Sequence, residues 1–308
     1  MFVSLKACKM KLPGLFIMFI SFFSANIYAQ ITNGDFESWA SKGNYEDPSG
    51  WVSTNGLTLL GNPLSVKKSN DAHSGTYACE MTAIKVINKF PGVFIPDYTG
   101  GIYTGSQIGL NPIYGIAYSL RPALLKFYYK YNARNNDTAS VSLVLSHWNT
   151  SKGSKDTIAF GFSHMKDSMG TYSKNEITLQ YFDTLTTPDT LTILFSAITL
   201  FATHDGASLL IDDVTLSGGN VGIGAVSPEN IFSIFPNPSN AGKIFVKANL
   251  GQTPLKIELL DLEGQKTIIL REGNNGEFYF ETSTLSAGCY FLHITSDGHT
   301  TFHKLLIY

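Results

Sequence analysis

Aromatic side chains at the ends of strand-like segments are the residues in this sequence best suited to hold a ligand. Trp148 ends an apolar alternation, follows His147, and leads into a polar loop at 149–156. A flat indole packs against the C–H face of a sugar ring, and planar polar side chains beside it bind the hydroxyls. Three tyrosines that border a glycine-rich segment are further ligand-binding candidates: Tyr98, Tyr103 and Tyr114. Core packing is the alternative for each of them, and it is the expectation for Trp39 and Trp51 beside turn motifs.

Residue patterns for catalysis do not occur in recognisable form. Glycoside hydrolysis needs two carboxyl groups about 5–10 Å apart across the bond. The sequence has no Glu-x-Asp-x-x-Glu strand, and Glu46 and Asp47 are neighbours in a turn. Its seven histidines show no zinc-binding spacing, and no Gly-x-Ser-x-Gly elbow occurs. Because none of these motifs occurs, the sequence does not favour an enzyme. A catalytic carboxylate pair assembled from distant strands stays an open alternative.

Strands must position these candidates, because apolar and polar residues alternate with period 2 along much of the chain and no convincing amphipathic helix occurs. Charged residues make up 15% of the chain and aromatic residues 13%, with 28 glycines, which is typical of β-sandwiches. Several short strands bounded by turn residues are expected before residue 218. The clearest of them are 122–132, 138–147, 156–163, 174–182, 190–197 and 208–216.

A second all-β segment runs from Phe232 to Tyr308. It opens with FSIFPNPSNAG, continues through LLDLEGQK and LSAGCYFLHI, and ends with HKLLIY. Pro236 and Pro238 must end its first strand, because proline cannot donate a ladder hydrogen bond, and Glu263-Gly264 fits a tight hairpin. These motifs resemble the type A C-terminal sorting domain of the type IX secretion system of Bacteroidetes. The resemblance implies an Ig-like domain that is read by the export machinery and cut by its sortase, with surface lipopolysaccharide as the anchor.

The upstream segments resemble a second family. NGDFESW, PSGW, SGTYACEMT, GGIYTG, RPALLKFYYKY, TPDTLTILFSA and SLLIDDVTL occur in this order between Ile31 and Gly218. Together they resemble the carbohydrate-metabolism jelly-roll domain of Bacteroidetes surface proteins and, more loosely, carbohydrate-binding modules of the galactose-binding type. The resemblance implies a jelly roll that associates with glycans, and it supplies no catalytic residue set.

The same resemblance implies a structural calcium ion (Ca2+) where the first strand meets the last. The matching residues are Asp35 or Glu37 with Asp212 or Asp213, and we expect Glu37 and Asp212 as the ligands. Calcium takes several hard oxygen ligands, which carboxylates and loop carbonyls provide. Because neighbouring strand residues point to opposite faces, only one of the two aspartates is expected to bind. Solvated strand-end carboxylates are the alternative.

The N-terminal segment has the pattern of a signal peptide at 1–29. Three lysines precede the apolar run 15–23, which is too short to span a bilayer, and cleavage is expected after Ala29. The remaining chain keeps 19 of the 22 basic residues against 24 acidic ones, a balance that indicates no nucleic-acid partner. Two cysteines also remain, Cys79 and Cys289, and we expect both to be free, buried thiols.

The sequence therefore predicts an all-β protein with a jelly-roll β-sandwich at 30–218, a linker at 219–229 and a smaller Ig-like β-sandwich at 230–308. The favoured function is a secreted, surface-displayed, non-catalytic module that binds a polysaccharide or mediates adhesion. A glycan-active enzyme and a structural envelope protein without a ligand are the alternatives. No membrane span is expected in the mature chain, because no second apolar run is long enough.

Overall fold

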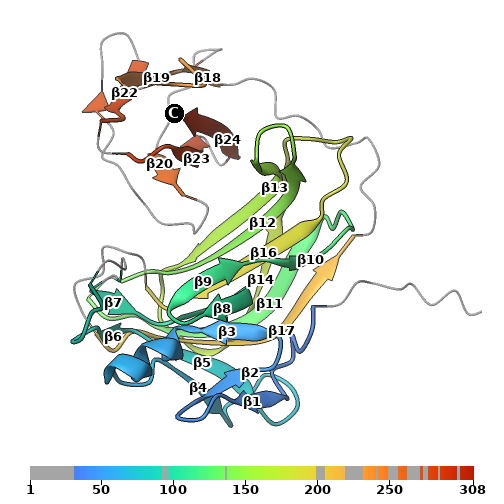
Figure 1. Cartoon of the computed structure of the whole chain (residues 1–308), viewed down its shortest axis with the longest axis vertical. Coiled ribbons are helices and arrows are strands. Elements are labelled where there is room, and N and C mark those ends of the chain that lie inside the picture. Colours follow the sequence, from blue (N-terminus) through green and yellow to red (C-terminus); the bar gives the residue numbers. More distant parts are fainter. Residues whose placement is uncertain are drawn as a thin grey trace, which may run out of the picture.

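The computed structural model describes residues 31–308 except 92–94, 96, 136, 199–204, 219–231, 241, 249–255, 262–270, 273–276, 284 and 297–298. It contains a larger β domain formed by the first part of the chain and a smaller one formed by the last part (Figure 1). The predicted signal peptide and linker lie outside the described residues. Within those residues, no helix has the length and apolar character needed to cross a membrane.

An eight-stranded antiparallel sheet forms one layer of the larger domain. Its strands are β3 (Trp51–Ser53), β8 (Gly101–Ile108), β9 (Asn111–Tyr114), β10 (Ile116–Ala117), β12 (Ala139–Asn149), β13 (Ser154–Met165), β15 (Gln180–Tyr181) and β16 (Thr190–Ser196). The main path across the sheet is β15-β13-β12-β16-β8-β3, with β10 paired to β16 and β9 to β8. The long hairpin β12–β13 begins at the pair Ala139–Met165 and closes at Asn149–Ser154.

A five-stranded antiparallel sheet forms the second layer of the larger domain. In order across the sheet, its strands are β14 (Met169–Thr178), β11 (Leu124–Asn132), β17 (Ser208–Ser217), β5 (Ala78–Thr82) and β4 (Val66–Ser69). The last strand of the domain, β17, therefore lies at the centre of its sheet. The remaining elements are β1 (Trp39–Ser41), β2 (Glu46–Pro48), the 3-10 helix η1 (Thr54–Leu60), β6 (Ile84–Lys85) and β7 (Tyr98–Thr99).

The core of the larger domain lies between these two sheets. Alternate residues of β12, namely Val141, Leu143 and Leu145, are fully buried in it. The ring of Phe127 on β11 packs edge-on against Phe195 on β16, with 5.0 Å between the ring centroids, and so joins the two layers. The inward-facing residues of these strands follow the period-2 pattern of the sequence, and the predicted all-β sandwich is confirmed.

The smaller domain is also built from two sheets. One contains β18 (Phe232–Phe235), β19 (Lys243–Ala248), β22 (Glu277–Glu281) and β21 (Arg271–Glu272), and the other contains β20 (Lys256–Leu260), β23 (Gly288–Ser296) and β24 (His299–Ile307). A separate core joins them and includes Ile244 of β19 and Leu292 of β23. Strand β18 ends directly before Pro236, as expected, whereas the predicted turn at 263–264 lies outside the described residues.

The two domains contact each other through the three-stranded sheet of the smaller domain and the β12–β13 hairpin of the larger one (Figure 1). Both cysteines of the described chain are free, as predicted. Cys79 is fully buried in the main core, whereas Cys289 is half-buried at the contact between the domains. The fold therefore needs no covalent crosslink between the domains.

Candidate functional site

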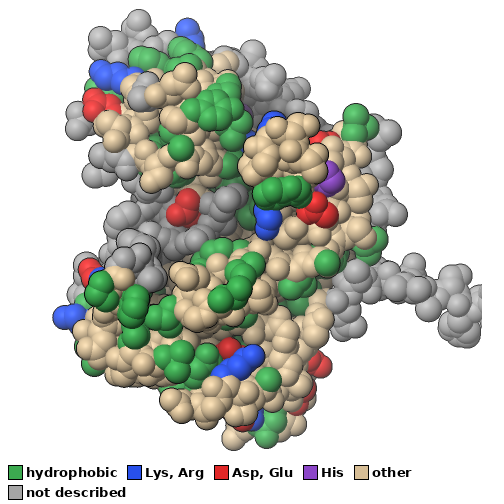
Figure 2. All heavy atoms as spheres, viewed as in Figure 1, with side chains coloured by type: hydrophobic (Ala, Val, Ile, Leu, Met, Phe, Trp, Pro, Cys, Tyr) green, Lys and Arg blue, Asp and Glu red, His purple; other side chains and the backbone are tan. Residues whose placement is uncertain are grey.

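The outer face of the eight-stranded sheet, which points away from the main core, carries the exposed tryptophan. Strand alternation places Ser142, Val144, Ser146 and Trp148 of β12 on this outer face. Trp148 is 49% exposed, at the tip of the β12–β13 hairpin. On the side of the larger domain seen in Figure 2, hydrophobic side chains are interspersed with polar ones. Trp148, exposed near the end of its strand, is available to a ligand that has both apolar and polar groups.

The other two tryptophans have structural positions. Trp51 is buried in the main core and donates its indole N–H to the Thr32 carbonyl at 3.2 Å. Trp39 is half-buried against the same core and donates to the Phe36 carbonyl at 2.7 Å. Both therefore have the packing role that the sequence suggested, and Trp148 differs from them in exposure.

Polar side chains surround the backbone of Trp148. Its N–H donates to Asp189 Oδ2 at 2.7 Å, and His147 Nδ1 lies 3.4 Å from the same oxygen. On the partner strand, Asp156 accepts from Asn149 Nδ2 at 2.6 Å and pairs with Lys152 at 2.8 Å. The acidic groups near the indole are thus matched by neighbouring hydrogen-bond donors and by Lys152 and Lys155, which leaves a nearly neutral, polar rim.

The two aspartates of this rim are held in the ionised form. Hydrogen bonds from Lys152 and Asn149 lower the pKa of Asp156 below its ordinary value. Burial alone would raise the pKa of Asp189, but hydrogen bonds from Thr190 and from the Trp148 N–H outweigh it and lower the pKa. A general acid of a glycosidase needs a raised pKa instead. Neither aspartate next to Trp148 is therefore suited to donate a proton at neutral pH.

The three candidate tyrosines do not form one group. Tyr103 of β8 lies on the same outer face as Trp148, but it is buried because Tyr114 of β9 packs on it at 4.8 Å between ring centroids. The Tyr114 carbonyl accepts from Lys155 Nζ at 3.3 Å, and Lys155 is paired with Trp148 across the hairpin. Tyr98 packs against the main core instead. The structure thus brings Tyr114 towards the Trp148 hairpin and places Tyr98 elsewhere.

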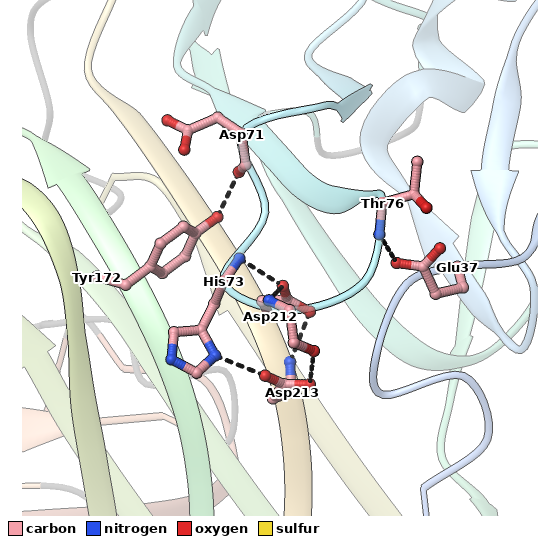
Figure 3. Close-up of polar contacts among 8 residues, drawn as sticks. Glu37, Asp71, His73, Thr76, Tyr172, Asp212 and Asp213 are labelled. Atoms are coloured by element: carbon pink, nitrogen blue, oxygen red, sulfur yellow. Dashed lines mark hydrogen bonds and ion pairs between the residues drawn. The ribbon is translucent and has the colours of Figure 1, made fainter.

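A second polar cluster lies where β17 meets the loop before β5 (Figure 3). Asp212 is fully buried, and its Oδ2 accepts from the N–H groups of His73 at 2.8 Å and Ser74 at 3.1 Å. Asp213 Oδ2 lies 2.7 Å from His73 Nδ1, and Asp213 Oδ1 accepts from Ser74 Oγ at 2.8 Å. The His73 ring stacks on Tyr128, with 3.5 Å between centroids. Together these contacts fasten the loop to the central strand of its sheet.

The predicted calcium ligands belong to this region, but amide groups already contact them. Glu37 Oε1 accepts from the N–H groups of Thr76 at 2.7 Å and Tyr77 at 2.9 Å. Gly75 adopts a φ of +64° there, and a Cβ at this position would lie 2.3 Å from Glu37 Oε1. Among the described residues, no group of three or more His, Cys, Asp or Glu side chains could hold a metal ion. A calcium ion would have to compete with these donors, and the calcium site stays a prediction.

Simple strand alternation at Asp212 and Asp213 was the wrong expectation. Asp213 has a positive φ of 51°, and the pairing of β11 with β17 shifts register between Lys126 and Tyr128. This irregularity turns the second carboxylate towards the same loop that the first one contacts. His73, which completes the cluster, was not expected from the sequence, because 140 residues separate it from Asp213.

The carboxylates with raised pKa values lie inside the fold and away from Trp148. Burial raises the pKa of Asp212, and it also raises the pKa of Asp47, which accepts a short hydrogen bond from Ser53 Oγ. Asp47 is only 2% exposed and Asp212 is fully buried. A substrate cannot reach Asp47 or Asp212 unless the domain opens. Their hydrogen bonds to nearby residues give both carboxylates a structural role.

The smaller domain can be identified by its sequence family. Residues 233–308 match the family described as secretion system C-terminal sorting domain. This match covers nearly all of the smaller β-sandwich, whose strands begin at Phe232. The C-terminal domain is therefore a sorting domain. No curated protein matches the sequence.

Solved structures similar to the chain include glycoside hydrolase-like and carbohydrate-binding domains. A Bacteroides thetaiotaomicron protein provisionally named a glycoside hydrolase has a TM-score of 0.49 and 16% identity, over 59% of this chain and 69% of that chain. A similarly named Bacteroides vulgatus protein has a TM-score of 0.47 and 17% identity, over 59% and 96%. A xylan-binding domain from Paenibacillus barcinonensis has a TM-score of 0.32 and 12% identity, over 62% and 94%. Similarity at this level assigns no ligand.

Proposed function

We propose that the larger domain is a non-catalytic glycan-binding module that a secretion system displays at the cell surface. The observation that carries this proposal is Trp148, a half-exposed indole on the outer sheet face with amide, imidazole and carboxylate groups around its base. A sugar ring offers an apolar C–H face to the indole and hydroxyls to the polar rim. The sorting domain supports delivery outside the cell.

The rim around Trp148 favours an uncharged glycan. Lys152 and Asp156 pair with each other at 2.8 Å, and His147 lies 3.4 Å from Asp189. Lys155, opposite Trp148 across the hairpin, offsets the charge of Asp189, so the two lysines and two aspartates leave little net charge to attract an acidic or basic ligand. Uncharged hydroxyls can still hydrogen-bond to the amide of Asn149 and to free lone pairs of the two carboxylates. The domain is therefore proposed to bind neutral polysaccharide chains.

Two observations support binding over hydrolysis. The pKa values of Asp156 and Asp189 are lowered, so neither group is an acid at neutral pH. The aspartates whose pKa values are raised, Asp47 and Asp212, are buried in hydrogen-bonded loops. The export route completes the proposal: the type IX machinery recognises the sorting domain, its sortase removes it, and lipopolysaccharide anchors the larger domain.

A glycan array tests the proposal with the chain from residue 30 to residue 308. Trp148→Ala should weaken the affinity for the neutral polysaccharide that the parent chain binds by about 10- to 100-fold, because a central aromatic anchor contributes about 1.4–2.8 kcal/mol of binding free energy. Phe90→Ala is the matched control, since Phe90 is also exposed, at 52%. Both variants should unfold at the same urea concentration as the parent.

Other outcomes would change the assignment. Unchanged affinity of Trp148→Ala for a bound glycan would remove the proposed site. Release of reducing sugars during incubation with the polysaccharide would show a glycan-active enzyme instead. Binding to no glycan on the array would favour a structural envelope protein.

A further inference from the structure

The sorting domain covers part of the same sheet face that carries Trp148. Val144 of β12 and Phe160 and Phe162 of β13 point outward, away from the main core, yet none of them is more than 7% exposed. They are buried by three apolar residues of the sorting domain, one from each strand of its three-stranded sheet: Leu260, Phe291 and Phe302. The contact therefore hides an apolar patch that the larger domain would otherwise show to solvent.

The geometry of this contact is that of stacked rings. Phe291 lies parallel to Phe160, with 3.9 Å between the ring centroids and 7° between the ring planes. Phe302 meets Phe160 edge-on at 5.3 Å, and Phe182 stacks on Phe291 from the larger domain at 5.6 Å. Phe291 thus occupies the space directly over a flat aromatic face, as the C–H face of a sugar would.

Polar groups frame the apolar patch. Gln180 Nε2 donates to the Phe302 carbonyl at 2.7 Å, and the Phe302 N–H donates to Gln180 Oε1 at 3.0 Å. Ser142 and Ser146 lie on the same face of β12 beside Val144. An amide and hydroxyls interleaved with flat rings suit a polyhydroxylated ligand better than a lipid surface, which would need a continuous apolar area.

We propose that Phe160 and Phe162, with Gln180 and Phe182 beside them, form a second sugar-binding platform that the sorting domain occupies in the intact chain. The platform is continuous with the site at Trp148, because Val144 and Trp148 lie four residues apart on one face of β12. The sorting domain and a neutral glycan chain compete for it. Glycan binding at this platform is therefore weak while the sorting domain is docked and becomes stronger when it leaves. The inference rests on the proposed glycan-binding function.

A reversible crosslink can hold the sorting domain in place. Thr157 Oγ1 of β13 lies 3.8 Å from Cys289 Sγ, so Thr157→Cys places a second thiol next to the native one. A protease site inserted in the 219–229 segment then allows the chain to be cut without removing either domain. After the cut, oxidised Thr157→Cys keeps the sorting domain bound, whereas reduction leaves it held only by non-covalent contacts and free to dissociate on dilution. Thr157→Ser, treated in the same way, is the control for the redox and protease steps.

The measurement is the dissociation constant for the neutral polysaccharide that the intact chain binds, before and after reduction of cut Thr157→Cys. We expect reduction to strengthen binding at least about tenfold, and Phe160→Ala to abolish this gain while leaving binding through Trp148 intact. Thermal unfolding of the larger domain should be unchanged by the cut, which shows that the released form is folded.

Equal affinity in the oxidised and reduced forms, with binding still lost in Trp148→Ala, would overturn the platform and leave the proposed function in place. Failure of the crosslink to form would overturn the docked arrangement. Absence of glycan binding in every form would refute the proposed function itself. Adsorption of the reduced, cut protein to lipid vesicles in place of polysaccharide would assign the patch to a membrane and overturn the inference.

Discussion

Lowering the pH from 8 to 5 should loosen the contact between the two domains through His164. This residue follows Phe162 on the outer face of β13, and its side chain is 12% exposed. Its Nε2 is 4.0 Å from Glu258 Oε2 of the sorting domain, beyond hydrogen-bonding distance. Burial lowers the pKa of His164 from 6.5 to about 4, and the charges of Lys256, Lys166 and His293 add to this, against the opposite effect of Glu258. The docked state therefore favours the neutral imidazole.

The sign and size of the effect follow from proton linkage. In the undocked state His164 faces solvent and binds a proton below its ordinary pKa of 6.5, whereas the docked state does not until about pH 4. Docking is thus strongest above pH 6.5 and weakens as the pH falls towards 4. At pH 5 the loss is about 2 kcal/mol, or about 30-fold in the docking equilibrium. Glu258 stays ionised over this range, since hydrogen bonds from His293 and Lys256 outweigh its burial and lower its pKa.

The docking equilibrium can be measured by calorimetry between the two parts of the cut chain at pH 8 and pH 5. His164→Gln keeps a polar side chain but cannot titrate, so its dissociation constant should change less than about threefold over this range. Burial also lowers the pKa of His303 within the sorting domain. Because His303 is present in both the parent chain and His164→Gln, its contribution cancels when the two are compared. The same 30-fold loss in His164→Gln, or no loss in the parent chain, would refute the role of His164.

Two further predictions concern the cluster around β17. Asp212→Ala should lower the free energy of unfolding in urea by about 3 kcal/mol or more, because three partly buried backbone N–H groups lose the acceptor that the buried carboxylate provides. Asp213→Ala should cost clearly less, and equal costs would contradict this assignment. A calcium ion bound by Glu37 and Asp212 predicts that EDTA lowers the melting temperature and that added calcium restores it; an unchanged melting temperature would exclude the ion.

Local sequence patterns predicted the candidate residue at the hairpin tip but not the cluster at β17. Trp148 could be chosen because it ends an alternating segment and precedes a polar loop, and it is indeed exposed at the end of β12. The contact of His73 with Asp213 could not be predicted, because it joins two segments 140 residues apart and depends on a positive φ at Asp213. Period-2 reasoning fails wherever such an irregularity turns a side chain to the other face.

By itself, the sequence determined that the chain is all-β, that it has two domains, and that the second is a sorting domain, because alternation and turn residues act locally along the chain. Only the tertiary structure decided what covers each outer face. Residues 157–162 of β13 are all buried, although alternate residues of a strand point to opposite sides. The sequence shows the apolar run IAFGF, but only the docking of Phe291 and Phe302 explains why both of its sides are apolar. Which surfaces meet depends on contacts between residues more than 100 positions apart, and strand periodicity carries no information about them.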